Sequence, residues 1–198
     1  MAGPTLRDLL KLPAVPAPLS KSTLILIDCQ NTYRQGLMQL EGVEPALKVC
    51  AELLERARGA GRPVIHIQHD AGAGSPYDVR AEIGQIANVV APRDGEPVIT
   101  KLYPSSFEKT DLDATLKALG ATDLVLGGFM THMCVNSTAR AAFNHGYRPT
   151  VIASATATRS LPTASGGSIP AAQVHEAALS AIMDLFAVVV PGASWIAA

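Results

Sequence analysis

Short apolar runs alternate along the chain with longer segments in which apolar residues recur every three or four positions. The short runs cover residues 22–28, 63–69, 97–101, 122–128, 149–155 and 187–190. The longer segments cover residues 43–61, 111–120, 134–144 and 170–186. The short runs predict buried strands, and the longer segments predict amphipathic helices. This alternation predicts an α/β fold, in which right-handed crossovers build a mostly parallel sheet with helices on both faces.

Residues 1–21 differ from the rest of the chain because they are enriched in proline and leucine. They predict an irregular N-terminal arm that packs on the body of the protein or on a partner subunit. We expect residues 22–198 to form a single domain, because a chain of 198 residues can bury one sizeable core.

Composition narrows the class of protein. The formal net charge is -1, from 16 basic and 17 acidic residues, which indicates neither nucleic acid nor an anionic membrane as a partner. No apolar run approaches the ~20 residues of a membrane span, and the N-terminus does not have the pattern of a secretion signal. Three cysteines at unrelated spacings do not form a disulfide framework. We therefore expect a cytoplasmic protein with reduced thiols.

Polar side chains follow the predicted strands at their carboxyl ends. In an open parallel sheet these ends form the edge at which ligands bind. The residues placed there are Asp28, His69, Lys101, the corner at 127–134 and the segment 154–159.

Three of these residues are an acid, an ammonium and a thiol. Cys134 is predicted to lie at the start of a helix, where the partial positive charge and a nearby Lys101 favour the nucleophilic thiolate. Asp28 could orient Lys101 or take the thiol proton and return it to a leaving group. Free backbone N–H groups at the same corner could hold an oxyanion. Each residue also has an ordinary alternative role: Cys134 as a small core residue, Asp28 as a helix or turn cap, and Lys101 as a surface lysine.

These residues lie within three motifs, LIDCQNTY (26–33), ITKLYPSSF (99–107) and GGFMTHMCVNSTARAAFNHGY (127–147). In this order, across about residues 22–190, the motifs resemble isochorismatase-like cysteine hydrolases, a group that includes nicotinamidases, N-carbamoylsarcosine amidases and maleamate amidases. The resemblance implies a three-layer fold around a six-stranded parallel sheet. It also implies a catalytic triad with Asp28 as acid/base, Lys101 as its lysine and Cys134 as nucleophile.

The same resemblance implies a cis peptide bond between Phe129 and Met130. The N–H groups of Met130 and Cys134 would then form the oxyanion hole.

Other residues near the motifs could contact a substrate. The candidates for the substrate pocket are Gln30, Tyr33, Phe107, Phe129, His132 and Arg159. The rings of Tyr33 and Phe107 suit a flat amide, although ordinary packing would also explain them. His132 has either a pocket or a loop role. Arg159 follows the fifth strand, where the resemblance implies an arginine near a substrate carboxylate; a structural ion pair is the alternative.

We expect no metal and no cofactor. Nicotinamidases carry an Asp-x-His pattern and a further histidine after the second strand, whereas this chain has HIQHD at 66–70. His66 and His69 are three residues apart on a strand, so they tend to face opposite sides. Cys29 and Cys50 are predicted to be structural, because one faces away from Asp28 and the other lies on a helix stripe.

The sequence therefore predicts a hydrolase that cleaves a C–N bond of a small amide or ureido substrate through a thioester on Cys134. One alternative is an inactive relative that acts by binding or assembly. Another is a hydrolase of a non-amide, isochorismate-like substrate; true isochorismatases of this fold lack the cysteine. A redox thiol protein would need Cys-x-x-Cys, which is absent. We also expect a homodimer or homotetramer, because AVVVPGASWIAA (187–198) and the arm are apolar.

Overall fold

A six-stranded sheet runs through the centre of the protein. The structure is a computed structural model, and it describes residues 3–197. The strands are β1 (Ser22–Ile27), β2 (Val64–His69), β3 (Val98–Lys101), β4 (Asp123–Phe129), β5 (Arg148–Ala157) and β8 (Val188–Val190). They lie in the order β3-β2-β1-β4-β5-β8, and every neighbouring pair is parallel. The predicted α/β fold with a parallel sheet is confirmed.

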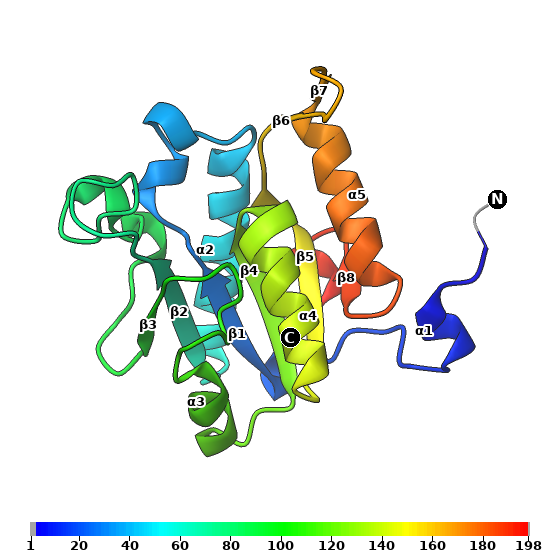
Figure 1. Ribbon diagram of the computed structural model, residues 1–198. Helices are drawn as coiled ribbons and strands as arrows, with labels where there is room; N and C mark the ends of the chain where they lie inside the picture. The colour runs from blue at the N-terminus through cyan, green and yellow to red at the C-terminus, as the bar shows by residue number, and fades with distance from the viewer. Residues whose placement is uncertain (1–2, 198) are drawn as a thin grey trace.

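Helices cover both faces of this sheet. They are α2 (Val43–Gly59), α3 (Leu112–Ala118), α4 (Asn136–Asn144) and α5 (Ala171–Met183), whereas the short helix α1 (Leu6–Leu9) has no buried residue. The apolar stripe of α2 packs in one hydrophobic cluster, whereas buried residues of α3, α4 and α5 pack in a second. Figure 1 shows α4 and α5 on the near side of the sheet and α2 on the far side.

Strand β1 explains why two cores form. All six of its residues are buried, because it lies in the middle of the sheet with a helical layer on each side. Leu24 and Leu26 join the cluster under α2, while Ile25 and Ile27 join the other cluster. This period of two is the pleat of a strand. Because β1 ends at Ile27, the next residue lies at the carboxyl edge of the sheet.

Shorter elements complete the chain. A small hairpin of β6 (Leu161–Pro162) and β7 (Ser168–Ile169) follows β5 and was not evident in the apolar pattern, because it has only four residues in its strands. The 3₁₀ turns are Leu19–Lys21, Asn31–Tyr33, Gly36–Met38, Glu82–Gly84, Asn88–Val90 and Ala193–Trp195, and Thr131–Val135 is a π-helical turn.

The N-terminal arm is attached to the end of α5. The Arg7 N–H donates to the Asp184 carbonyl at 2.8 Å, and the Arg7 guanidinium donates to the Leu185 carbonyl. Figure 1 shows α1 beyond α5 at the side of the molecule. Val15 and Trp195 are 77% and 64% exposed in the single chain, so the predicted oligomer stays a prediction. Within residues 3–197, no helix combines the length and apolarity needed to cross a membrane.

Gly128 lets β4 approach β1 closely before the chain turns into the site. Its φ of +122° lies where side chains are strained, and a Cβ there would overlap the Ile27 carbonyl oxygen. We expect Gly128→Ala to lower the free energy of unfolding by about 3 kcal/mol or more, measured by urea denaturation.

Gly146→Ala is the matched control. Gly146 also has a positive φ, of +88°, but a Cβ there meets nothing within 4 Å. It should lose only about 1–2 kcal/mol from backbone strain. Equal losses for the two variants would show that the close approach of β1 and β4 is not what requires Gly128.

Candidate active site

Asp28, Lys101 and Cys134 meet at the carboxyl edge of the sheet. Lys101 Nζ lies 2.7 Å from Asp28 Oδ2 and donates a hydrogen bond to Cys134 Sγ at 3.3 Å. The three residues are 0%, 1% and 5% exposed. The structure thus brings together the acid, the ammonium and the thiol that the sequence places at three strand ends.

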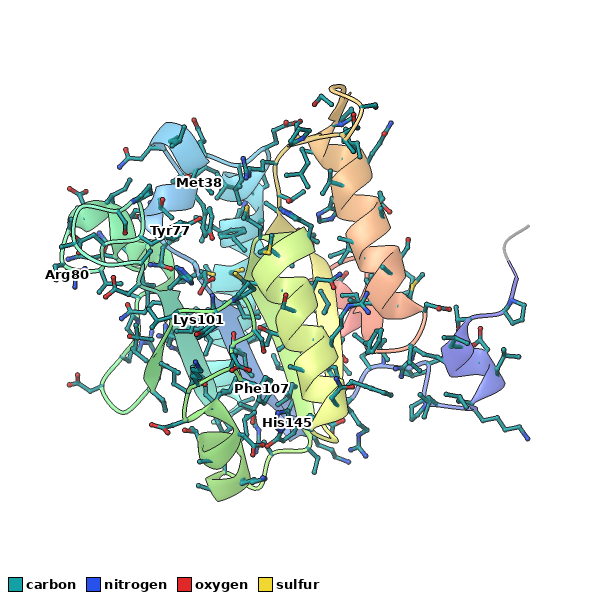
Figure 2. The ribbon with its side chains drawn as sticks, viewed as in Figure 1. Met38, Tyr77, Arg80, Lys101, Phe107 and His145 are labelled. Atoms are coloured by element: carbon teal, nitrogen blue, oxygen red, sulfur yellow. The ribbon has the colours of Figure 1, made fainter. Side chains whose placement is uncertain are left out.

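Strand order explains how they meet. Asp28 directly follows β1, and Lys101 is the last residue of β3. Because β2 lies between these strands, the Lys101 side chain must reach across the end of β2. Cys134 approaches from the other side of β1, in the π-helical turn that follows β4. Lys101 is labelled in Figure 2, below Tyr77.

Asp28 has an unusual environment for a carboxylate. Its backbone is left-handed, with φ 49°, and its N–H donates to the Ile67 carbonyl at 2.9 Å. Within the described residues, neither carboxylate oxygen receives a hydrogen bond of good geometry. Lys101 Nζ lies close to Asp28 Oδ2, but the angles of this contact do not fit a hydrogen bond, so the contact is an ion pair. A carboxylate with unused lone pairs beside a thiol can accept a proton.

Burial controls the ionisation of the three groups. Desolvation raises the pKa of Asp28, and the positive charge of Lys101 opposes this rise. For Lys101, burial alone would lower the pKa, but the charges of Asp28 and Cys134 outweigh it and the net direction is upward. Burial and the negative charge of Asp28 raise the pKa of Cys134 to about 12, against the influence of Lys101.

The predicted depression of the thiol pKa is therefore wrong for the protein without substrate. Lys101 does act in the predicted direction, but removing Cys134 from water outweighs it. The resting thiol is neutral at pH 7. A thiolate can form there only by loss of this proton, and the Asp28 carboxylate interacts directly with the thiol.

Backbone N–H groups face the same corner. The peptide bond between Phe129 and Met130 is cis, at the position that the family resemblance implies. Within residues 3–197, the Met130 N–H donates to no other protein group, and the Met130 carbonyl accepts from Met133 and Val135. Helix α4 begins at Asn136, so Cys134 lies in the turn before this helix rather than at its predicted first residue.

Aromatic rings line the side of the site toward β2. Tyr33 packs edge-on against Phe129, with centroids 5.7 Å apart, and against Tyr77 at 5.8 Å. Tyr77 also packs on His69 at 5.0 Å. Burial is the largest cause of the raised pKa of Tyr33, and the negative charges of Asp28 and Cys134 raise it further. The Tyr33 ring therefore lies near both groups. Sequence reasoning missed Tyr77, because it lies in an aperiodic loop; its motif SPYD gave only a turn signal.

Phe107 was predicted to be a pocket wall, and the structure contradicts this. Its ring stacks on His145 at 4.8 Å and lies 5.9 Å from Tyr147. Figure 2 shows Phe107 and His145 together near α3, away from Lys101 and Tyr77. After β3 the chain turns back along the sheet, so a residue six positions beyond Lys101 covers the core instead of the site.

Gln30 was also predicted to line the pocket, but its amide is fully occupied by backbone groups. Its Nε2 donates to the carbonyls of His69 and Gly84, and its Oε1 accepts from the His69 N–H at 2.8 Å. The side chain is completely buried. Gln30 therefore joins the loops after β1 and β2 and offers no free polar atom to a substrate.

His132 lies in the same π-helical turn as Cys134, and Arg159 follows the end of β5. His132 Nδ1 contacts the Thr158 hydroxyl at 2.5 Å. Burial and then the charge of Arg159 lower the pKa of His132. Burial raises the pKa of Tyr77, and the positive charge of Arg159 opposes this rise. The exposed Arg159 guanidinium therefore lies within electrostatic reach of the His132 ring and the Tyr77 ring.

His66 and His69 have separate partners. His66 Nε2 lies 3.0 Å from Glu96, whereas His69 Nδ1 lies 3.2 Å from Lys101 Nζ. In the described part of the chain, no group of three His, Cys, Asp or Glu side chains is arranged to hold a metal ion. Cys29 and Cys50 pack in the cluster under α2, on the face away from Cys134.

Several known proteins are similar to this chain in sequence. A family model described as Isochorismatase domain matches residues 22–194. A secreted isochorismatase effector from Verticillium dahliae is 33% identical over 93% of this chain and 95% of its own length. Streptothricin hydrolase from Streptomyces noursei is 32% identical over 87% of this chain and 69% of its own length. Ureidoacrylate amidohydrolase RutB from Stutzerimonas stutzeri is 32% identical over 74% and 75%.

Solved structures agree with the fold. A crystal structure of an isochorismatase from Pseudomonas putida matches with a TM-score of 0.93 and 40% identity, covering 98% of this chain and 99% of that chain. A cysteine hydrolase from Pseudomonas syringae pv. phaseolicola matches with a TM-score of 0.80 and 25% identity, covering 98% and 96%.

We expect iodoacetamide to modify Cys134 before Cys29 or Cys50, which are 1% and 0% exposed. The reagent reacts with thiolate. Because burial raises the pKa of Cys134 to about 12, labelling should be slow at pH 7 and accelerate with each rise in pH. Peptide mapping by mass spectrometry across a pH series measures both the site and the rate.

Lys101→Met is the matched comparison. It should slow labelling of Cys134 at every pH, because the ammonium acts to lower the thiol pKa. First labelling at Cys29 or Cys50, or a rate that does not change with pH, would contradict this picture of the site.

Proposed function

The chain belongs to the isochorismatase family, and from this premise we propose that it is a cysteine-dependent hydrolase of a small amide or ureido compound. The family match agrees with the resemblance that the three sequence motifs indicate. The observation that carries the proposal is the position of Lys101 Nζ, 2.7 Å from Asp28 and 3.3 Å from Cys134, in a site almost closed to solvent.

The first step makes the nucleophile. The Cys134 thiol is neutral at rest, so Asp28 takes its proton as the sulfur attacks the substrate carbonyl carbon. Burial raises the pKa of Asp28, which makes it a stronger base than an exposed carboxylate. The ammonium of Lys101 stabilises the negative charge that passes from the carboxylate to the sulfur.

The second step needs a place for the carbonyl oxygen. The Met130 N–H has no protein acceptor in the described chain, and with the Cys134 N–H it is proposed to bind the oxyanion. The tetrahedral intermediate then expels ammonia or an amine, which takes the proton from Asp28. A thioester between Cys134 and the acyl group remains.

Water completes the cycle. Asp28, ionised again after the amine has left, takes a proton from a water molecule that attacks the thioester carbonyl. The acid product forms and the proton returns to Cys134. One carboxylate thus acts as base, acid and base in turn, which fits a group with no hydrogen-bond donor fixed on its lone pairs.

The walls of the site favour a flat, small substrate. Tyr33, Tyr77 and Phe129 offer ring edges and faces to an unsaturated acyl group. Arg159 is exposed near His132 and could pair with a substrate carboxylate. The relative named ureidoacrylate amidohydrolase and the relative named streptothricin hydrolase support C–N cleavage for this chain.

A second candidate is hydrolysis of an isochorismate-like vinyl ether. The names of the Verticillium dahliae and Pseudomonas putida relatives favour it. Against it stands Cys134, paired with Lys101, because true isochorismatases of this fold lack the cysteine and vinyl-ether cleavage requires no acyl-sulfur intermediate. Release of ammonia from a panel of small amides and ureido acids, assayed beside isochorismate, separates the two reactions.

With a substrate from that panel, Cys134→Ala and Asp28→Asn should each lower kcat by about 10³-fold or more, because each removes a member of one catalytic unit. The double variant should be little worse than the poorer single variant. Cys29→Ala is the matched control, since its thiol faces α2, and should keep turnover. Full turnover by Cys134→Ala would contradict the proposed function.

A further inference from the structure

His69 lies beneath the terminal nitrogen of Lys101 for a topological reason. It ends β2 and is paired in register with Lys101 on β3. Because β2 separates β3 from β1, the lysine side chain must pass over the end of β2 to reach Asp28. His69 Nδ1 lies 3.2 Å from Lys101 Nζ at that crossing.

The direction of this contact follows from chemistry. An ammonium group has three N–H donors and no acceptor, so Nδ1 of His69 must accept and the ring proton must sit on Nε2. Burial and the charge of Lys101 lower the pKa of His69, which keeps the ring neutral at pH 7. Nζ then has two hydrogen-bond acceptors, His69 at 3.2 Å and Cys134 at 3.3 Å, and forms an ion pair with Asp28 at 2.7 Å.

His69 is itself held rigidly. Its backbone N–H donates to Gln30 Oε1 at 2.8 Å, and its carbonyl accepts from Gln30 Nε2 at 2.9 Å. The edge-on contact with Tyr77 limits rotation of its ring. The labelled Tyr77 and Lys101 can be located in Figure 2. Because the backbone and the ring face of His69 are both held in place, its Nδ1 can hold Lys101 Nζ in place.

We propose that His69 is a positioning residue, whose Nδ1 holds the Lys101 ammonium facing both Asp28 and Cys134. The role rests on the proposed function, because Lys101 matters only if the thiol reacts. Without this acceptor, one ammonium proton is buried without a partner, so Lys101 shifts or loses charge and stabilises the thiolate less.

Two variants separate the ring nitrogens. In His69→Asn the side-chain oxygen can occupy the place of Nδ1, whereas the longer side chain of His69→Gln places its polar atoms nearer the position of Nε2. We expect His69→Gln to lower kcat by about 10- to 100-fold with little change in KM, the size expected for losing a hydrogen bond to a charged group. His69→Asn should keep most of the activity. Gln68→Ala, whose side chain bonds Thr100 instead, is the control and should behave as wild type.

A second measurement needs no substrate. At one fixed alkaline pH, iodoacetamide should label Cys134 more slowly in His69→Gln than in the wild type, and at close to the wild-type rate in His69→Asn. A purely structural role predicts the opposite sign, because a loosened site would admit the reagent faster. Faster labelling, unchanged labelling, or equal losses in both variants would overturn the inference.

These outcomes are distinct from failure of the proposed function, which full turnover by Cys134→Ala would reveal. If His69→Gln does not fold, ¹⁵N NMR of the wild-type imidazole decides the matter. We expect a neutral ring with its proton on Nε2 at pH 7, and a proton on Nδ1 would overturn the inference.

Discussion

The buried ion pair between Lys101 and Asp28 is the interaction on which the rest of the site depends. Taking both charges out of water is costly, and removing one partner of such a pair typically costs about 3–5 kcal/mol. The pair can exist only because parallel strands bring the carboxyl ends of β1, β2 and β3 to one edge. It also explains the crowding around Nζ, where Cys134 and His69 supply further acceptors.

The same burial sets the chemistry that the sulfur can perform. An exposed thiolate at a helix start would be reactive toward many electrophiles, whereas the Cys134 thiol, with its pKa raised to about 12 by burial, is held in its neutral form. The proposed reaction then begins only when a carbonyl group fills the corner and Asp28 takes the proton. In this account, selectivity comes from coupling nucleophile formation to substrate binding, since neither Asp28 nor Lys101 is accessible to bulk solvent.

The sequence was sufficient for the six strands of the parallel sheet and for the meeting of Asp28, Lys101 and Cys134, because periodicity and strand ends define them. It failed where the chain is aperiodic. Phe107 packs on the core and not in the site, because the path after β3 reverses, and Tyr77 comes from a loop with only a turn signal. The direction of the thiol pKa was wrong because a sequence gives charges but not the degree of burial that outweighs them.

A covalent acyl group on Cys134 is the central claim, and mass spectrometry of acid-quenched reactions tests it most directly. The protein is mixed with excess amide substrate and quenched at times spanning the first turnover. The account predicts that the Cys134 peptide gains the mass of the acyl group less one hydrogen, and that hydroxylamine removes this addition. An acyl group on another residue, or ammonia released through the first turnover with the Cys134 peptide unmodified at every time, would contradict it.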